Sequence, residues 1–223
     1  NIYELAKSLS KNLAKSAVVG EVNGTLVDLG YKLKDNDEVN ILTYEDEKAI
    51  EVMRHSTSHI MAQAVKRVFK DVKLAIGPSI ENGFYYDFDI ENPLTLEDLK
   101  RIEKEMNNII AENLSFERID LSRQDALKLM EDRGEDYKVE LINDLPEGEK
   151  ISLYKQGDFV DLCRGPHLYS TKYVKAFKLT SVAGAYWRGN EKNKMLQRVY
   201  GVAFASKDEL KTYLYNLEAA KKR

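Results

Sequence analysis

The three histidines and the single cysteine of this 223-residue chain fall into two short-range pairs. His55 and His59 stand four residues apart, a spacing that places two side chains on one face of a helix, one turn apart. Cys163 and His167 have the same spacing, and the Gly-Pro step between them predicts a turn that brings the thiol and the imidazole together. Residues of these types bind metals or transfer protons, so we expect the two pairs to form one site.

Two kinds of chemistry are open to such a site. A thiolate and imidazoles are common ligands of zinc. Without a metal, imidazoles can position a water molecule and take its proton during hydrolysis. The spacing of the four residues does not separate these alternatives.

The elements that must position the site follow from hydrophobic periodicity. The histidine pair belongs to a helix expected over residues 46–69, with Met53, Ile60 and Ala64 on the side away from the imidazoles. The cysteine pair follows two short strands expected over 151–155 and 158–162. The site therefore combines a long helix with a turn at the end of a strand.

The N-terminal part of the chain has a different pattern. Residues 2–13 show helical spacing, and residues 17–29 read as a hairpin because Asn23-Gly24 supplies the positive φ angles of a type I′ turn. A further strand over 38–43 completes a small unit, and the acidic stretch after it marks a domain boundary at about residue 44.

The remainder is predicted to be an α+β domain with an antiparallel sheet. Phe84, Tyr86 and Phe88 alternate along one strand and share a core-facing side. Trp187 is expected to pack in the protein, with stacking on a nucleotide base as the alternative. The other expected helices are 95–113, 123–133 and one beginning after Ser206, and the other expected strands are 73–77, 83–89, 137–142, 174–180 and 194–204.

Composition narrows the class of protein. The net charge is −3, so any RNA contact must be local rather than a property of the whole surface. No apolar run approaches the roughly 20 residues that span a bilayer, so we expect no membrane partner. One cysteine cannot form an internal disulfide, which suits a reducing, cytoplasmic location.

Several motifs resemble bacterial threonyl-tRNA synthetases. They lie at 54–59 (RHSTSH), 76–78 with 82–87 (IGP, NGFYYD), 161–167 (DLCRGPH), 184–189 (GAYWRG) and 193–198 (NKMLQR). The resemblance implies that residues 1–44 are a TGS domain of β-grasp (ubiquitin-like) fold that lacks its first hairpin. It implies that residues 45–223 are an editing domain ending in a linker helix, and that the aminoacylation and anticodon-binding parts are missing.

The function implied by the resemblance is hydrolysis of serine wrongly esterified to threonine tRNA. The implied partners are the acceptor end of that tRNA and the rest of the synthetase chain, which would form a homodimer as a full-length enzyme. ATP, Mg²⁺ and Zn²⁺ would belong to the missing aminoacylation domain, and no cofactor is firmly expected here.

The resemblance also assigns residues to the pocket. The implied catalytic group comprises His55, His59, Lys138, Asp161, Cys163 and His167, and the implied substrate contacts are Gly77 and Tyr86. Ser58 stands where alanine is usual in the family. Lys138 is expected on a strand, to support the amino acid or water, and Asp161 to pair with the substrate ammonium.

Hydrolysis also needs a way to reject threonine, which exceeds serine by one methyl group. The excluding wall is expected near Gly77 or Ala183. Cys163 is expected to be a polar wall rather than a nucleophile, because acyl transfer to sulfur would add a deacylation step.

Two other functions stay open. One is a zinc-dependent alanyl-tRNA deacylase, because the alanyl relatives of this family hold zinc, and the other is a non-catalytic RNA-binding module stabilised by zinc. In either case the expected ligands are His55, His59, Cys163 and His167.

Overall fold

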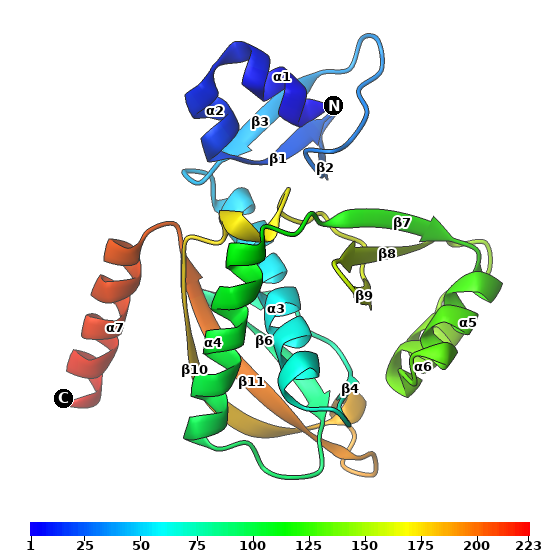
Figure 1. Ribbon diagram of the computed structural model, residues 1–223, viewed down its shortest axis with the longest axis vertical. Helices are drawn as coiled ribbons and strands as arrows, with labels where there is room; N and C mark the ends of the chain where they lie inside the picture. Colours follow the sequence, from blue (N-terminus) through cyan, green and yellow to red (C-terminus); the bar gives the residue numbers. More distant parts are fainter.

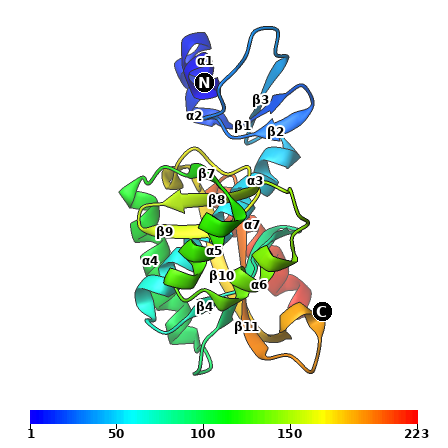
Figure 2. The same ribbon diagram turned by 90° about the vertical axis from the view of Figure 1, so that its right-hand side faces the viewer.

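The computed structural model describes residues 1–223 and places the N-terminal unit at one end of the molecule, beside the start of a long helix (Figures 1 and 2). This unit contains helices α1 (Ile2–Leu9) and α2 (Lys11–Ser16) and strands β1 (Ala17–Val22), β2 (Thr25–Val27) and β3 (Val39–Thr43). The strands form an antiparallel sheet in the order β2-β1-β3. As expected, Asn23 and Gly24 have positive φ angles in the hairpin turn.

The expected helix over residues 2–13 is two helices. Ser10 has an extended backbone, with φ at −167°, and its side chain accepts a hydrogen bond from Leu13 N. A serine that caps the second helix therefore ends the first, although the apolar spacing continues across it.

The larger part of the chain is built on an antiparallel sheet in the order β10-β11-β6-β4, with β5 also paired to β6. Its strands are β4 (Lys73–Leu74), β5 (Ser79–Ile80), β6 (Gly83–Asp89), β10 (Ala176–Tyr186) and β11 (Met195–Phe204). Helices α3 (Glu47–Val68) and α4 (Leu96–Glu112) cover one face of this sheet (Figure 1). Phe84, Tyr86 and Phe88 point into the core between them and are fully buried, as predicted.

A second lobe lies beside the sheet and contains strands β7 (Glu117–Leu121), β8 (Ile151–Gln156) and β9 (Phe159–Leu162) with helices α5 (Arg123–Asp132) and α6 (Asp136–Asp144). A final helix, α7 (Lys207–Lys221), stands away from the main body (Figure 1). The fold is thus the predicted α+β arrangement with antiparallel sheets.

The predicted strand over 137–142 is wrong, because these residues belong to helix α6. The alternation of Lys138, Val139, Glu140 and Leu141 imitates a strand, but Gly134 with φ at +70° turns the chain back after α5. Ile142 then packs against Met130 of that helix, and this tertiary contact decides the local structure.

Two further differences from the predicted elements concern strands. The strand predicted to end at residue 180 continues through Gly184 and Ala185, which lie inside β10 and pair with Gln197 and Leu196. Strand β7 was not expected, because its side chains are largely exposed and carry little hydrophobic signal. Trp187 is buried against Ala75 and Leu196, as the packing alternative predicts.

Candidate functional site

Helix α3 carries both histidines of the first pair into the interior. It is buried on nearly every side: from Val52 to Val65, every residue except His55 is buried. The side of α3 that carries the histidines is therefore buried as well, and only His55 is partly exposed. His59 is fully enclosed, and its ring lies 4.9 Å from that of His55.

The second pair lies on the segment that leaves β9. Gly165 has φ at +72°, and a Cβ atom at this position would lie 2.0 Å from the hydroxyl oxygen of Tyr154. Only glycine fits this turn, which presents Cys163 and His167 to the same point. The Gly165–Pro166 peptide bond is cis.

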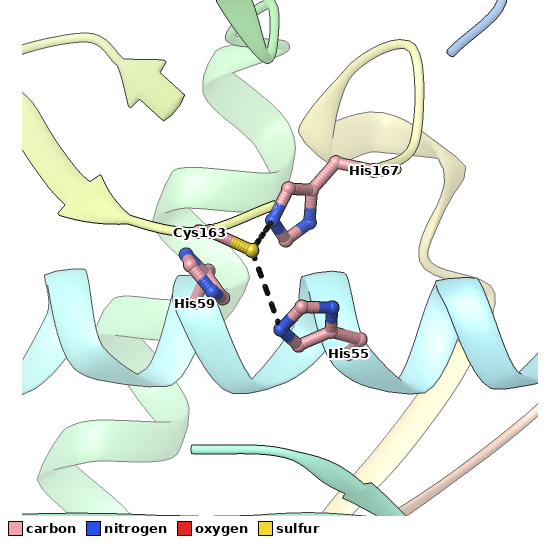
Figure 3. Close-up of side chains that lie close together, drawn as sticks. All are labelled: His55, His59, Cys163 and His167. Atoms are coloured by element: carbon pink, nitrogen blue, oxygen red, sulfur yellow. Dashed lines mark hydrogen bonds between the residues drawn. The ribbon is translucent and has the colours of Figure 1, made fainter. Parts of the chain in front are cut away.

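The four side chains converge as the sequence predicts (Figure 3). Cys163 Sγ lies 3.2 Å from His167 Nε2 and 3.7 Å from His55 Nε2. The rings of His59 and His167 are 4.3 Å apart. One nitrogen of each histidine and the Cys163 sulfur all lie within 4.8 Å of one another.

A buried polar network lies next to this cluster. Lys138 Nζ is 2.8 Å from Asp161 Oδ1, and Tyr86 donates its hydroxyl hydrogen to Asp161 Oδ2 over 2.7 Å. Lys138 also donates to the carbonyl oxygen of Ala75, over 2.5 Å. His59 Nδ1 has no hydrogen-bond partner and lies 3.5 Å from Asp161 Oδ2.

This network changes what Lys138, Asp161 and Tyr86 can do. All three side chains are buried, and Asp161 is only 1% exposed. Because both oxygens of Asp161 already face protein groups, an ion pair with a substrate ammonium would require one of these contacts to break. Their present contacts instead fix the surroundings of His59.

Burial sets the protonation of the cluster. It lowers the pKa of His59 and of His167 well below the ordinary 6.5, and the neighbouring imidazoles lower both pKa values further. Burial also lowers the pKa of His55, with a smaller opposing effect from Asp161. The three imidazoles are therefore neutral at pH 7.

The thiol is also uncharged at neutral pH. Burial raises the pKa of Cys163 to about 12, although the N–H of Gly165 donates to the sulfur and lowers it in part. A protonated thiol is a weak nucleophile, which agrees with the expectation that Cys163 forms part of the wall.

The two expected wall positions lie in different places. A Cβ atom on Gly77 would come within 2.1 Å of the Tyr86 ring, so the Gly77 loop packs tightly against this member of the buried polar network. Ser58 donates to the carbonyl oxygen of Gly77, which ties the loop to α3. Ala183 is exposed on the opposite face of the sheet, in register with Arg198, so it does not join the group.

Two residues at the site, Ser56 and Asp28, were not predicted from the sequence. Ser56 Oγ lies 2.9 Å from His167 Nδ1 and accepts from the N–H of Leu168. Asp28, from the N-terminal unit, accepts hydrogen bonds from the N–H of His167 and from the hydroxyl of Tyr154. Ser56 could have been suspected beside His55, whereas the long-range contacts of Asp28 leave no local signal.

The donor set suits a zinc ion. Three imidazoles and one thiol can supply the four ligands of a tetrahedral site. A metal would deprotonate the thiol, which the pKa of about 12 otherwise keeps protonated. The residues present therefore fit zinc as well as a metal-free arrangement.

Two segments of the chain match known protein domains. Residues 1–43 match the TGS domain, and residues 151–200 match the threonyl and alanyl tRNA synthetase second additional domain. The matched segment 151–200 includes Cys163 and His167. The chain thus combines a TGS domain with a segment similar to a domain of threonyl and alanyl tRNA synthetases.

The whole chain aligns with threonine–tRNA ligases. It is 62% identical to that of Acetivibrio thermocellus and 60% identical to that of Caldanaerobacter subterraneus, each over 222 residues and all of this chain. The Clostridioides difficile enzyme is 57% identical over 223 residues. The chain is therefore a homologue of threonyl-tRNA synthetases along its whole length, and it spans 35%, 34% and 35% of these relatives.

Proposed function

We propose that this chain hydrolyses the ester of seryl-tRNA that carries the threonine tRNA body, using a positioned water molecule. The observation that carries the proposal is the convergence of three neutral imidazoles and a thiol within a domain related to tRNA synthetase editing domains. The partners of the reaction would be the acceptor end of the tRNA and the rest of a synthetase chain. Zinc-free chemistry is the simpler form of this proposal.

The need for such a reaction follows from the size of the amino acids. A pocket that distinguishes threonine from serine by one methyl group gains only about 10- to 200-fold selectivity. A second site that accepts serine and excludes the larger side chain corrects the remaining errors.

His55 is the best candidate for the general base. It is the most exposed of the three histidines, and its lowered pKa leaves the imidazole neutral and able to accept a proton from water. A base with a pKa near or below the working pH is available in the required form. Cys163, also partly exposed, would form the adjacent wall without entering a covalent step.

The buried network would act through position rather than contact with substrate. The ion pair of Lys138 with Asp161 holds a negative charge beside His59, and Tyr86 completes its surroundings. We propose that these groups fix the orientation of His59, which in turn packs against both other imidazoles.

Selectivity would depend on the Gly77 loop. The hydrogen bond from Ser58 to Gly77 joins the segment before β5 to the histidine helix, and the position of Gly77 leaves no space for a side chain. We propose that the wall that excludes the threonine methyl group belongs to this loop and not to the strand of Ala183.

We further propose that the domains divide at about residue 44, with a TGS domain before and an editing domain after it. The match to the TGS domain ends at residue 43, where β3 ends, and α3 begins at Glu47. The short stretch between them belongs to neither element.

A zinc-dependent form is the second candidate, supported by the four-residue donor set. His55, His59, Cys163 and His167 would hold the ion, and zinc would supply Lewis-acid activation of water when bound. The two forms differ in metal content, which elemental analysis of protein purified without metal-affinity steps measures directly.

The test of the proposal is the rate of release from three substrates: seryl- and threonyl-esters on threonine tRNA and the alanyl-ester on alanine tRNA. We expect fast release of serine, slow release of threonine and no dependence on chelator. Preferential release of alanine with one equivalent of zinc would establish the second candidate instead. Absence of release from every ester would refute a catalytic role.

A further inference from the structure

Asp28 connects the N-terminal unit directly to the hydrolytic site. It follows β2, and its two carboxylate oxygens have different partners. Oδ1 accepts a hydrogen bond from the backbone N–H of His167 over 2.7 Å, and Oδ2 accepts from the Tyr154 hydroxyl over 2.6 Å. One side chain from outside the editing domain therefore holds both the backbone of a site histidine and a neighbour of its ring.

Tyr154 makes this second contact relevant to the site. Its ring lies edge-on to the His167 imidazole, with centroids 4.5 Å apart, while Phe116 stacks on the imidazole at 5.1 Å. The Tyr154 hydroxyl also fills the space that a Cβ atom on Gly165 would need. Its position thus defines both the orientation of the imidazole and the path of the turn between Cys163 and His167.

The segment held by Asp28 contains little regular secondary structure, and hydrogen bonds such as those of Leu168 to Ser56 and of Thr171 to Leu114 hold mainly its later part. Between the end of β9 at Leu162 and the start of β10 at Ala176, the only helix or strand is one short 3-10 turn, Thr171–Tyr173. Two more contacts from the N-terminal region reach this segment. Tyr3 stacks on Tyr169 with ring centroids 4.3 Å apart, and the Tyr44 hydroxyl donates to the carbonyl oxygen of Tyr173 over 2.6 Å.

We infer that Asp28 is a positioning residue for the hydrolysis and that, through it, the N-terminal unit forms part of the working site. Hydrogen bonds to a charged carboxylate are stronger than neutral ones and hold their partners in a defined place. A displacement of about 1 Å in a positioned group can cost about 100-fold in rate. The inference rests on the proposed hydrolysis but adds to it a residue outside the domain that carries the histidines.

The test compares four variants of the full chain in steady-state deacylation of seryl-tRNA. Asp28→Ala loses both acceptors, Asp28→Asn keeps one oxygen for His167, and Tyr154→Phe keeps the ring but loses the hydroxyl. Glu21→Ala is the matched control, because Glu21 also joins the N-terminal unit to α3, through Lys48, without touching the segment.

We expect Asp28→Ala to lower kcat about tenfold or more, on the scale of a misplaced catalytic group, with KM changed less than about twofold. Asp28→Asn and Tyr154→Phe should show smaller losses of the same kind, and Glu21→Ala should match the wild type. A kcat of Asp28→Ala equal to that of the wild type would overturn the inference and leave the proposed hydrolysis intact. Equal losses in Asp28→Ala and Glu21→Ala would also overturn it.

A second readout does not depend on catalysis. Nitrogen-15 NMR of the three histidine side chains should show a displaced or broadened His167 signal in Asp28→Ala and Tyr154→Phe and an unchanged one in Glu21→Ala. If the wild type released no serine, the proposed function would fail, and this spectrum would still decide whether Asp28 positions His167. If Asp28→Ala did not fold, Asp28→Asn and Tyr154→Phe would carry the comparison, and unchanged spectra and rates in both would refute the inference.

Discussion

Lys138 Nζ and Asp161 Oδ1 lie 2.8 Å apart in a place that water hardly reaches, with side chains 3% and 1% exposed. A buried ion pair is held by its own attraction and by further hydrogen bonds, here from Tyr86 to the carboxylate and from Lys138 to the carbonyl of Ala75. The pair connects helix α6 to strand β9 and brings a negative charge beside His59. Removal of either member leaves the other charge without compensation.

Replacement of this lysine should therefore destabilise the protein strongly. We expect Lys138→Met to lower the free energy of unfolding by about 3–5 kcal/mol, the usual cost of an unpaired buried charge. Lys178→Met is the control, because its pair with Glu103 is partly exposed and should contribute about 0–1 kcal/mol. Urea unfolding followed by circular dichroism measures both, and equal small effects would show that the buried pair is not important for stability.

Cys163 should not act as a nucleophile. With its thiol pKa raised to about 12, Cys163 is protonated at neutral pH, so Cys163→Ser should retain most of the deacylation rate. Loss of a true nucleophile lowers kcat by several orders of magnitude. Single-turnover serine release measures the difference, and an acyl-enzyme trapped on Cys163 would contradict the account.

Stability should fall in mild acid. The folded-state pKa values of His59 and His167 lie below 6.5, so the unfolded chain binds more protons as the pH drops past 6.5. Through these two histidines, the free energy of unfolding therefore does not change with pH above pH 6.5, and it falls as the pH decreases below that value. We expect unfolding free energies to decrease from pH 7.5 to pH 5.5.

A histidine variant isolates this effect. His59→Leu removes one of the titrating groups and should flatten the pH dependence, whatever its effect on stability at pH 7.5. Asp28 has the opposite effect on the pH dependence. Burial raises its pKa, so its contribution to the free energy of unfolding decreases as the pH rises. An unchanged slope in His59→Leu would mean that other groups control acid unfolding.

The loop at Gly77 should not tolerate a side chain. The Cβ atom of Gly77→Ala would lie 2.1 Å from the Tyr86 ring and 2.8 Å from the carbonyl oxygen of Tyr85. Overpacking of this kind typically costs about 1–3 kcal/mol, and it would displace Tyr86 from Asp161. Gly30→Ala, with nothing within 4 Å of its Cβ, is the control in thermal unfolding, and equal melting temperatures would contradict the packing argument.

The sequence was sufficient to predict the cluster but not every residue around it. The spacing of the histidines and the Gly-Pro turn are local, and the structure joins the two pairs as expected. Lys138 was misplaced on a strand, because its apolar and polar neighbours alternate while the packing of Ile142 on α5 favours a helix. Asp28 was not predicted, because it meets His167 across 139 positions of the chain.

The burial of the Lys138–Asp161 pair could not be predicted from the sequence either. Residue types and spacing do not show that Lys138 and Asp161 pair with each other inside the protein. The residues of α3 from Val52 to Val65 are likewise buried, apart from His55. These features depend on how separate elements pack, which residue spacing does not encode.

Three neutral imidazoles around one thiol are the central feature of the account, and the most direct test removes two of them. Serine release from seryl-tRNA with the threonine tRNA body should be rapid with the wild-type chain and lost in His55→Ala/His59→Ala. The variant needs its fold verified by circular dichroism. Serine release by the folded variant at the wild-type rate would contradict the assignment of the active site.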